Sequence, residues 1–99
     1  MHQRTLRRMR DRIRRRLYVM TLHAEEEMNE DGLTIYDVER AILTCAILER
    51  QWDRVTAESK YRIRGDSIQG QTIEVIAKIG PTGKLVIITV YRLEGPESI

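Results

Sequence analysis

The chain has 99 residues, 41% hydrophobic and 32% charged, which is enough for one small globular domain and too few for a second core. No apolar run approaches the roughly 20 residues that span a bilayer, and the basic start lacks the apolar centre of a secretory signal. A single cysteine, Cys45, excludes an internal disulfide. It lies in the apolar pattern AILTCAIL, so we expect a buried thiol in a cytoplasmic protein.

The positive charge is concentrated at the start of the chain. Residues 1–16 carry eight arginines and one aspartate, whereas residues 17–99 carry nine Lys or Arg and fourteen Asp or Glu. This division predicts a partner for the arginines: a polyanion such as RNA or DNA, an acidic protein, or the acidic remainder of the same chain.

Residues 1–17 are predicted to form an arginine-rich helical arm, and residues 18–99 a single α+β domain. Apolar side chains recur along the arm at the spacing of one helix face: Leu6, Met9, Ile13 and Leu17. Like charges four residues apart repel, so the helix should order only when this stripe enters an apolar groove or when anions neutralise the arginines. The arginines selected for contact with a nucleic-acid backbone are Arg8, Arg12, Arg15 and Arg16.

Two short helices are expected next. Thr21 is a candidate N-cap for the helix that begins LHAEEEM, and Gly32 is the expected stop of this helix. The glutamates near its start suit the positive end of a helix dipole. A second helix should follow Thr34, which forms a near capping box with Asp37. The expected buried face of this helix is Ile35, Val38, Ala41, Ile42 and Cys45.

Four strands should complete the domain. The segments AILERQW, KYRIRGDSI, QTIEVIAKIG and GKLVIITVYRLE are rich in Val, Ile, Thr and Tyr, and turn residues in IQGQ and GPTG separate the last three. The last segment is apolar on both faces, so it should be central or covered on both sides. The order predicts an α+β fold with two short helices packed on a mainly antiparallel four-stranded sheet, and an extra N-terminal arginine-rich helix.

Several segments together carry a family resemblance. They are TLHAEEEM, GLTIYDVERAIL, KYRIRG, IEVIAKI and GKLVIITVYRLE, in this order over roughly residues 18–94. The chain resembles a family of small bacterial domains that open with Ser/Thr-x-His-Ala-x-x-Arg-Met and are grouped with the RelE/ParE-like toxin superfamily. The resemblance implies a RelE-like fold with a curved sheet. It also implies an activity related to ribosome-dependent or free messenger-RNA endonucleases, or to gyrase poisons, with an antitoxin as partner.

Two acids depart from the family pattern. Glu27 stands where the motif most often has arginine, and Asp31 stands where a second basic residue is common. Acids at these positions would repel phosphate, so they favour a domain that keeps the fold without catalysis.

The HAEEEM stretch raises the question of a metal site. His23 lies four residues from Glu27 and three from Glu26, so either pair could share a helix face. A metal site needs at least three protein ligands, the other histidine is His2 in the arm, and the chain has no Cys/His cluster. No metal and no other cofactor is therefore predicted.

Acid/base chemistry is the alternative use of these residues. Metal-independent RNA cleavage needs one group that takes the 2′-hydroxyl proton, one that protonates the leaving oxygen, and cations beside the phosphate. Histidine titrates near neutral pH, and Arg and Lys bind phosphate. The candidate catalytic residues are His23, Lys78, Tyr91 and Arg92. The candidates for holding RNA on the sheet alternate along one strand and so share a face: Lys60, Arg62 and Arg64.

Each candidate also has a purely structural explanation: a solvated sheet face, a hydrogen-bonded histidine, or a core tyrosine with its hydroxyl at the rim. The sequence predicts a toxin-like cytoplasmic protein that binds RNA, free or on the ribosome, pairs with an antitoxin-like protein, and would cleave RNA as a metal-independent endoribonuclease if catalysis is retained. Two alternatives stay open: a non-catalytic protein-interaction module on the same fold, and a DNA- or gyrase-directed binder. A homodimer is open too, and no membrane partner is expected.

Overall fold

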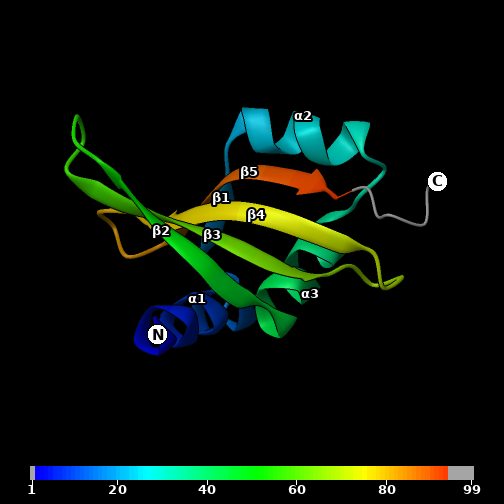
Figure 1. Ribbon diagram of the computed structural model, residues 1–99, viewed down its shortest axis with the longest axis horizontal. Coiled ribbons are helices and arrows are strands. Elements are labelled where there is room, and N and C mark those ends of the chain that lie inside the picture. Colours follow the sequence, from blue (N-terminus) through cyan, green and yellow to red (C-terminus); the bar gives the residue numbers. More distant parts are fainter. Residues whose placement is uncertain (1, 94–99) are drawn as a thin grey trace.

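A mixed five-stranded sheet forms the centre of the domain (Figure 1). The computed structural model describes residues 2–93. In chain order the elements are α1 (Gln3–Arg14), β1 (Tyr18–Met20), α2 (Leu22–Glu30), α3 (Ile35–Thr44), β2 (Ala46–Asp53), β3 (Glu58–Asp66), β4 (Thr72–Ile79) and β5 (Leu85–Arg92). The strand order across the sheet is β1-β5-β4-β3-β2, and all neighbours are antiparallel except β1 and β5, which are parallel. The fold is α+β, as predicted.

The fifth strand corrects the predicted four-stranded sheet. β1 is only three residues long, and it pairs through Tyr18, Val19 and Met20 with the start of β5. The β1 sequence YVM suits a strand, but its partner lies more than sixty residues later along the chain. A parallel pair needs a long connection between its strands, so no local turn signal announces it.

The predicted helix starts are confirmed. The Thr21 side chain accepts a hydrogen bond from the Ala24 N–H at 3.1 Å, which satisfies a free donor of α2. Thr34 and Asp37 form the capping box of α3, with the Thr34 N–H donating to Asp37 Oδ2 at 2.8 Å. Asp37 Oδ1 also accepts from the Ile68 N–H at 2.9 Å, so the same carboxylate fixes the β3–β4 turn.

The hydrophobic core lies between the sheet and the helices α1 and α3. In Figure 1 these two helices lie below the sheet, while α2 lies above it alongside β5. The α3 helix approaches β3 so closely that a Cβ on Gly65 would stand 2.1 Å from the Ala41 carbonyl oxygen, so only glycine fits at this position. The sheet residues buried in the core are Ile63, Ile73, Val75, Ala77, Leu85, Ile87 and Val90.

The arginine-rich helix α1 is anchored to this core. Met9 is fully buried and Ile13 is 4% exposed, and both belong to the same cluster as the side chains of α3 and the sheet. Arg10 donates from Nε to the Ile42 carbonyl at 3.2 Å and from Nη2 to the Cys45 carbonyl at 2.9 Å. Because the last carbonyls of a helix have no partner within it, Arg10 stabilises the end of α3 while it fixes α1.

We expect Met9→Ala to lower the free energy of unfolding by about 3 kcal/mol, because it leaves a cavity between α1 and α3. Urea unfolding measures this loss. Arg14→Ala, at an exposed position of the same helix, is the control and should change the stability little. Equal stability of the Met9 variant and the wild type would mean that α1 is not held in the core.

Candidate functional site

The sheet face turned away from α3 carries five of the side chains selected from the sequence: Lys60, Arg62, Arg64, Lys78 and Tyr91. Side chains alternate between the two faces of a strand, so the neighbours of buried Ile63 on β3, Arg62 and Arg64, face away from the core. The register places Glu74 of β4 opposite Arg64 and also opposite Tyr91 of β5. Three strands therefore bring a carboxylate, two guanidinium groups and a phenol to one place.

Glu74 is the centre of this group. Its side chain is 2% exposed, and it accepts hydrogen bonds from Arg64 Nη2 at 2.6 Å, from Arg62 Nη1 at 3.1 Å and from the Tyr91 hydroxyl. Arg62 also donates from Nε to Glu49 on β2, at 3.2 Å. A buried charge needs such partners, because an uncompensated carboxylate loses its solvation energy. We call Arg62, Arg64, Glu74 and Tyr91 the Glu74 cluster.

The contacts within the Glu74 cluster fix the protonation states. Burial alone would raise the pKa of Glu74, but hydrogen bonds from Tyr91, Arg64 and Arg62 outweigh it and hold the pKa below its ordinary value. The bond to Glu74, together with burial, raises the pKa of Tyr91. Tyr91 therefore keeps its proton and donates a hydrogen bond to the Glu74 carboxylate, so its hydroxyl is already engaged within the fold.

We expect Glu74→Gln to lower the free energy of unfolding by about 3 kcal/mol at neutral pH, because it removes the buried charge that two arginines share. The folded-state pKa lies below the unfolded value, so the charged carboxylate stabilises the fold above its ordinary pKa of 4.5, and this stabilisation is lost as the pH falls through the folded-state pKa. Urea unfolding across this range should show the stability gap between the two proteins narrowing in acid. Glu49→Gln, at a more exposed acceptor, should cost clearly less. A stability difference between the two proteins that does not depend on pH would contradict a charged Glu74 carboxylate in the folded protein.

The two lysines of the same face are also paired with acids. Lys60 Nζ lies 3.3 Å from Asp53 Oδ2, and Lys78 forms an ion pair with Glu58. Together with the Glu74 cluster, every cation selected on β3 and β4 therefore has a carboxylate partner. An incoming phosphate would have to displace a carboxylate at each of these positions.

Of the other two catalytic candidates, His23 belongs to α2 and Arg92 lies at the C-terminal end of this helix. His23 is exposed, and its Nε2 is 3.2 Å from Glu27 Oε1. Arg92 ends β5, and its backbone N–H donates to Asp31 Oδ2 at 2.8 Å. Within residues 2–93, no hydrogen bond or ion pair joins His23 to any of the other three candidates. A shared catalytic role for the four residues stays a prediction.

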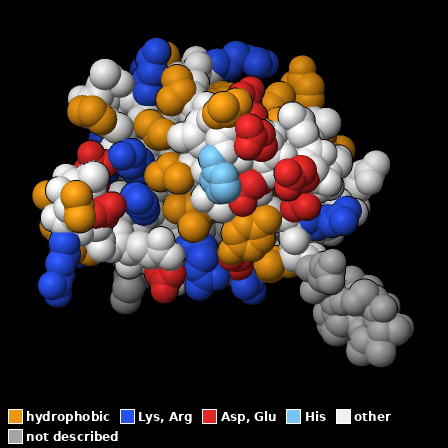
Figure 2. Space-filling view, turned by 90° about the horizontal axis from the view of Figure 1, so that it is seen from above, with side chains coloured by type: hydrophobic (Ala, Val, Ile, Leu, Met, Phe, Trp, Pro, Cys, Tyr) orange, Lys and Arg blue, Asp and Glu red, His pale blue; other side chains and the backbone are white. Residues whose placement is uncertain are grey.

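The surface around α2 is acidic. Figure 2 shows the molecule from the side of α2, where acidic side chains gather and a band of apolar side chains on the left separates them from a group of Lys and Arg side chains. Glu25, Glu26 and Glu30 are all exposed on this helix. A phosphate approaching His23 would meet this negative field.

Glu27 and Asp31, the two departures from the family pattern, have a structural role. β1 pairs only with the first three residues of β5, so the rest of that edge needs other partners. Glu27 Oε1 accepts from the Val90 N–H at 3.2 Å, and Asp31 accepts from the Arg92 N–H. Carboxylates from α2 therefore satisfy the open edge of β5 and protect it from pairing with another strand.

Glu27→Ala should speed hydrogen exchange of the Val90 amide by roughly fivefold, because the amide loses its acceptor. NMR-detected exchange measures this rate, with Glu26→Ala on the exposed face of α2 as the control. If both variants exchange like the wild type at Val90, the carboxylate does not protect the edge.

Among the arginines selected in the arm, two are engaged within the protein. Arg12 donates from Nε to the Gly83 carbonyl at 2.6 Å and pairs with Asp11 at 2.7 Å. Arg15 pairs with the same Asp11 at 3.1 Å. Arg8 and Arg16 are exposed.

The sequence prediction did not select three further exposed arginines of α1. Arg4, Arg7 and Arg14 are exposed on the side of α1 opposite Met9 and Ile13, and within residues 2–93 they form no ion pair or side-chain hydrogen bond. Their spacing of three and seven residues places them together on a helix. Choosing the face opposite the apolar stripe would have found them. We call Arg4, Arg7 and Arg14 the outward ridge.

Between residues 2 and 93, no three His, Cys, Asp or Glu side chains are placed to hold a metal ion. None of the helices in that range is both long and apolar enough to cross a bilayer.

The fold and the site define a small α+β domain with an ion-paired sheet face and an arginine-bearing helix. The chain belongs to the family described as a domain of unknown function (DUF4258), whose model matches residues 20–92. The match supports the predicted membership in a family of small domains, and α1 lies outside it. No curated protein and no solved structure matches the chain.

Proposed function

We propose that this protein binds the phosphate backbone of RNA through the outward ridge of α1, and that it binds RNA without cleaving it. The observation that carries the proposal is the contrast between two sets of cations. Those on the outward ridge are exposed and have no carboxylate partner within residues 2–93, whereas the Lys and Arg side chains of β3 and β4 are each paired with an acid.

The way α1 is held supports this use of the ridge. Met9 and Ile13 are buried, and Arg10 bonds the end of α3, so the helix is ordered before any ligand arrives. A preorganised helix does not lose the entropy of folding when it binds. Arginine also suits the task, because its guanidinium group can donate two parallel hydrogen bonds to a phosphate.

The sheet supports binding without cleavage. The proton of Tyr91 is engaged by Glu74, Lys78 is paired with Glu58, and His23 stands beside Glu27 on an acidic helix. Cleavage would need an acid, a base and uncommitted cations around one phosphate. These contacts favour a structural role for the sheet-face residues.

The proposal still includes a toxin-like fold and a protein partner. If the domain is RelE/ParE-like, its partner is an antitoxin-like protein, and a protein-interaction module is the second candidate function. The observation that favours this candidate lies on the edge strand β2, where Leu48 and Trp52 are 41% and 57% exposed. Apolar side chains on an open edge are typical of protein contacts.

The test is the affinity for a labelled single-stranded RNA, measured by fluorescence anisotropy as a function of salt. Each phosphate contact contributes about 0.7 to the slope of log affinity against log salt. The triple variant Arg4→Gln, Arg7→Gln and Arg14→Gln should therefore bind more weakly and lower the steepness of the slope by about 2. A DNA strand of the same sequence tests the DNA-directed alternative.

The matched control removes three exposed arginines elsewhere, through Arg40→Gln, Arg50→Gln and Arg54→Gln, and should keep the slope of the wild type. Equal slopes for the two triple variants would contradict the role of the ridge. Absence of RNA binding would leave the protein-interaction module as the better candidate. RNA that is cut by the wild type and spared by His23→Ala would show the endoribonuclease instead.

A further inference from the structure

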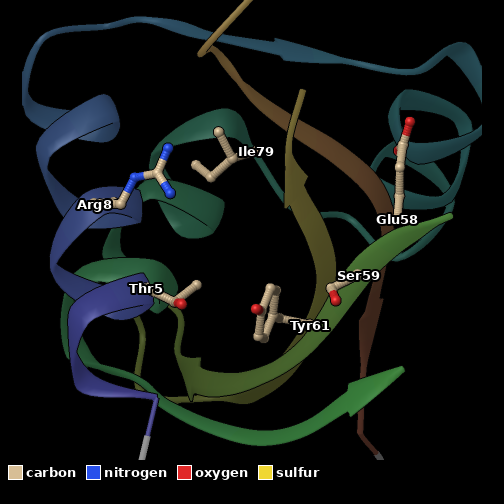
Figure 3. Close-up of a pocket in the computed structure, with 6 residues that line it drawn as sticks. All are labelled: Thr5, Arg8, Glu58, Ser59, Tyr61 and Ile79. Carbon is tan, nitrogen blue, oxygen red and sulfur yellow. The ribbon is translucent and has the colours of Figure 1, made fainter. Parts of the chain in front are cut away.

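A pocket of about 220 Å³ lies between α1 and the sheet (Figure 3). Two of its lining residues come from α1, three from β3 and one from the end of β4. They are Thr5, Arg8, Glu58, Ser59, Tyr61 and Ile79.

The polar groups of this pocket are available to a ligand. Within residues 2–93, no side-chain hydrogen bond or ion pair involves the hydroxyls of Thr5, Ser59 and Tyr61 or the guanidinium group of Arg8. Every buried polar side-chain atom in this range has a partner, so these four groups are not buried. They therefore face solvent with their hydrogen-bonding capacity unused. This distinguishes the pocket from the sheet face, where the acids and cations already satisfy each other.

The charge and shape of the pocket indicate which kind of ligand it would take. In Figure 3, Arg8 and Glu58 stand on opposite sides, with Tyr61 between them. Glu58 is paired with Lys78, so its charge is compensated and the Arg8 side is the place for an anion. The Tyr61 ring and Ile79 offer apolar surface, and the His2 ring packs against Tyr61 edge-on at a centroid distance of 5.7 Å.

We propose that the pocket receives one nucleotide of the RNA strand that the outward ridge binds. The phosphate lies at Arg8, the base packs against Tyr61 and Ile79, and the hydroxyls of the pocket bond the ribose and the edge of the base. The inference rests on the proposed function, because Arg8 follows Arg4 by one helical turn and so continues the ridge toward the sheet.

The first test separates recognition in the pocket from general attraction to the backbone. Arg8→Lys keeps the charge and removes the two-pronged hydrogen bonding, so the affinity for single-stranded RNA at fixed salt should fall roughly tenfold with an unchanged salt slope. Arg40→Lys, the same substitution at an exposed arginine outside α1, is the control and should bind RNA like the wild type. Equal affinities of the two lysine variants would overturn the pocket while leaving the ridge intact.

The second test does not depend on the ridge. Titration of isotope-labelled protein with adenosine 5′-monophosphate should shift the amide signals of Arg8, Ser59 and Tyr61 in a saturable way, and inorganic phosphate alone should shift chiefly Arg8. The variant Thr5→Val with Tyr61→Phe keeps the shape and removes two hydroxyls, so it should weaken this binding severalfold. Shifts confined to other parts of the protein, or equal binding by the variant, would overturn the pocket even if RNA binds α1.

Discussion

The burial of Met9 and Ile13 in the common core with α3 and the sheet determines which face of α1 is left to solvent. Both side chains are buried, and together with the hydrogen bonds of Arg10 they fix the rotation of α1 about its own axis. An arginine-rich helix without this anchor would be marginal in water, because its like charges repel each other. With the anchor, one face of the helix closes the core and the opposite face is left to solvent.

The sheet illustrates the other outcome for a cluster of charges. Arg62 and Arg64 converge on Glu74, a carboxylate that is 2% exposed, and the lysines beside them pair with Asp53 and Glu58. Because Glu74 and Glu49 together balance the two guanidinium groups, these charges stabilise the fold and contribute little to the field outside. Arginines on the sheet face therefore stabilise the fold, whereas those of the outward ridge face solvent. The difference lies in whether an acid stands opposite them.

Much of the fold follows from local signals in the sequence. Thr21, Thr34 and Asp37 cap the helices because the chemistry of capping is contained within four residues. The alternation of β3 correctly separates Ile63 from Arg62 and Arg64. β1 could not be assigned to the sheet, because its partner strand lies at the far end of the chain.

The polar contacts of the candidate site were harder to predict, because they depend on the register of the strands. Nothing local shows that Glu74 meets Tyr91 and two arginines, or that Glu27 accepts a bond from the Val90 N–H. The outward ridge is different. Once Met9 and Ile13 are recognised as the buried stripe, the helical repeat alone identifies the arginines on the opposite face.

The most direct test of this account is an NMR map of the protein with single-stranded RNA bound. The account predicts that the largest changes in amide signals fall on α1, along Arg4, Arg7 and Arg14, while the amides of Arg62, Arg64 and Tyr91 stay in place. Large changes on those three sheet residues, with α1 unaffected, would contradict it and return the binding site to the sheet.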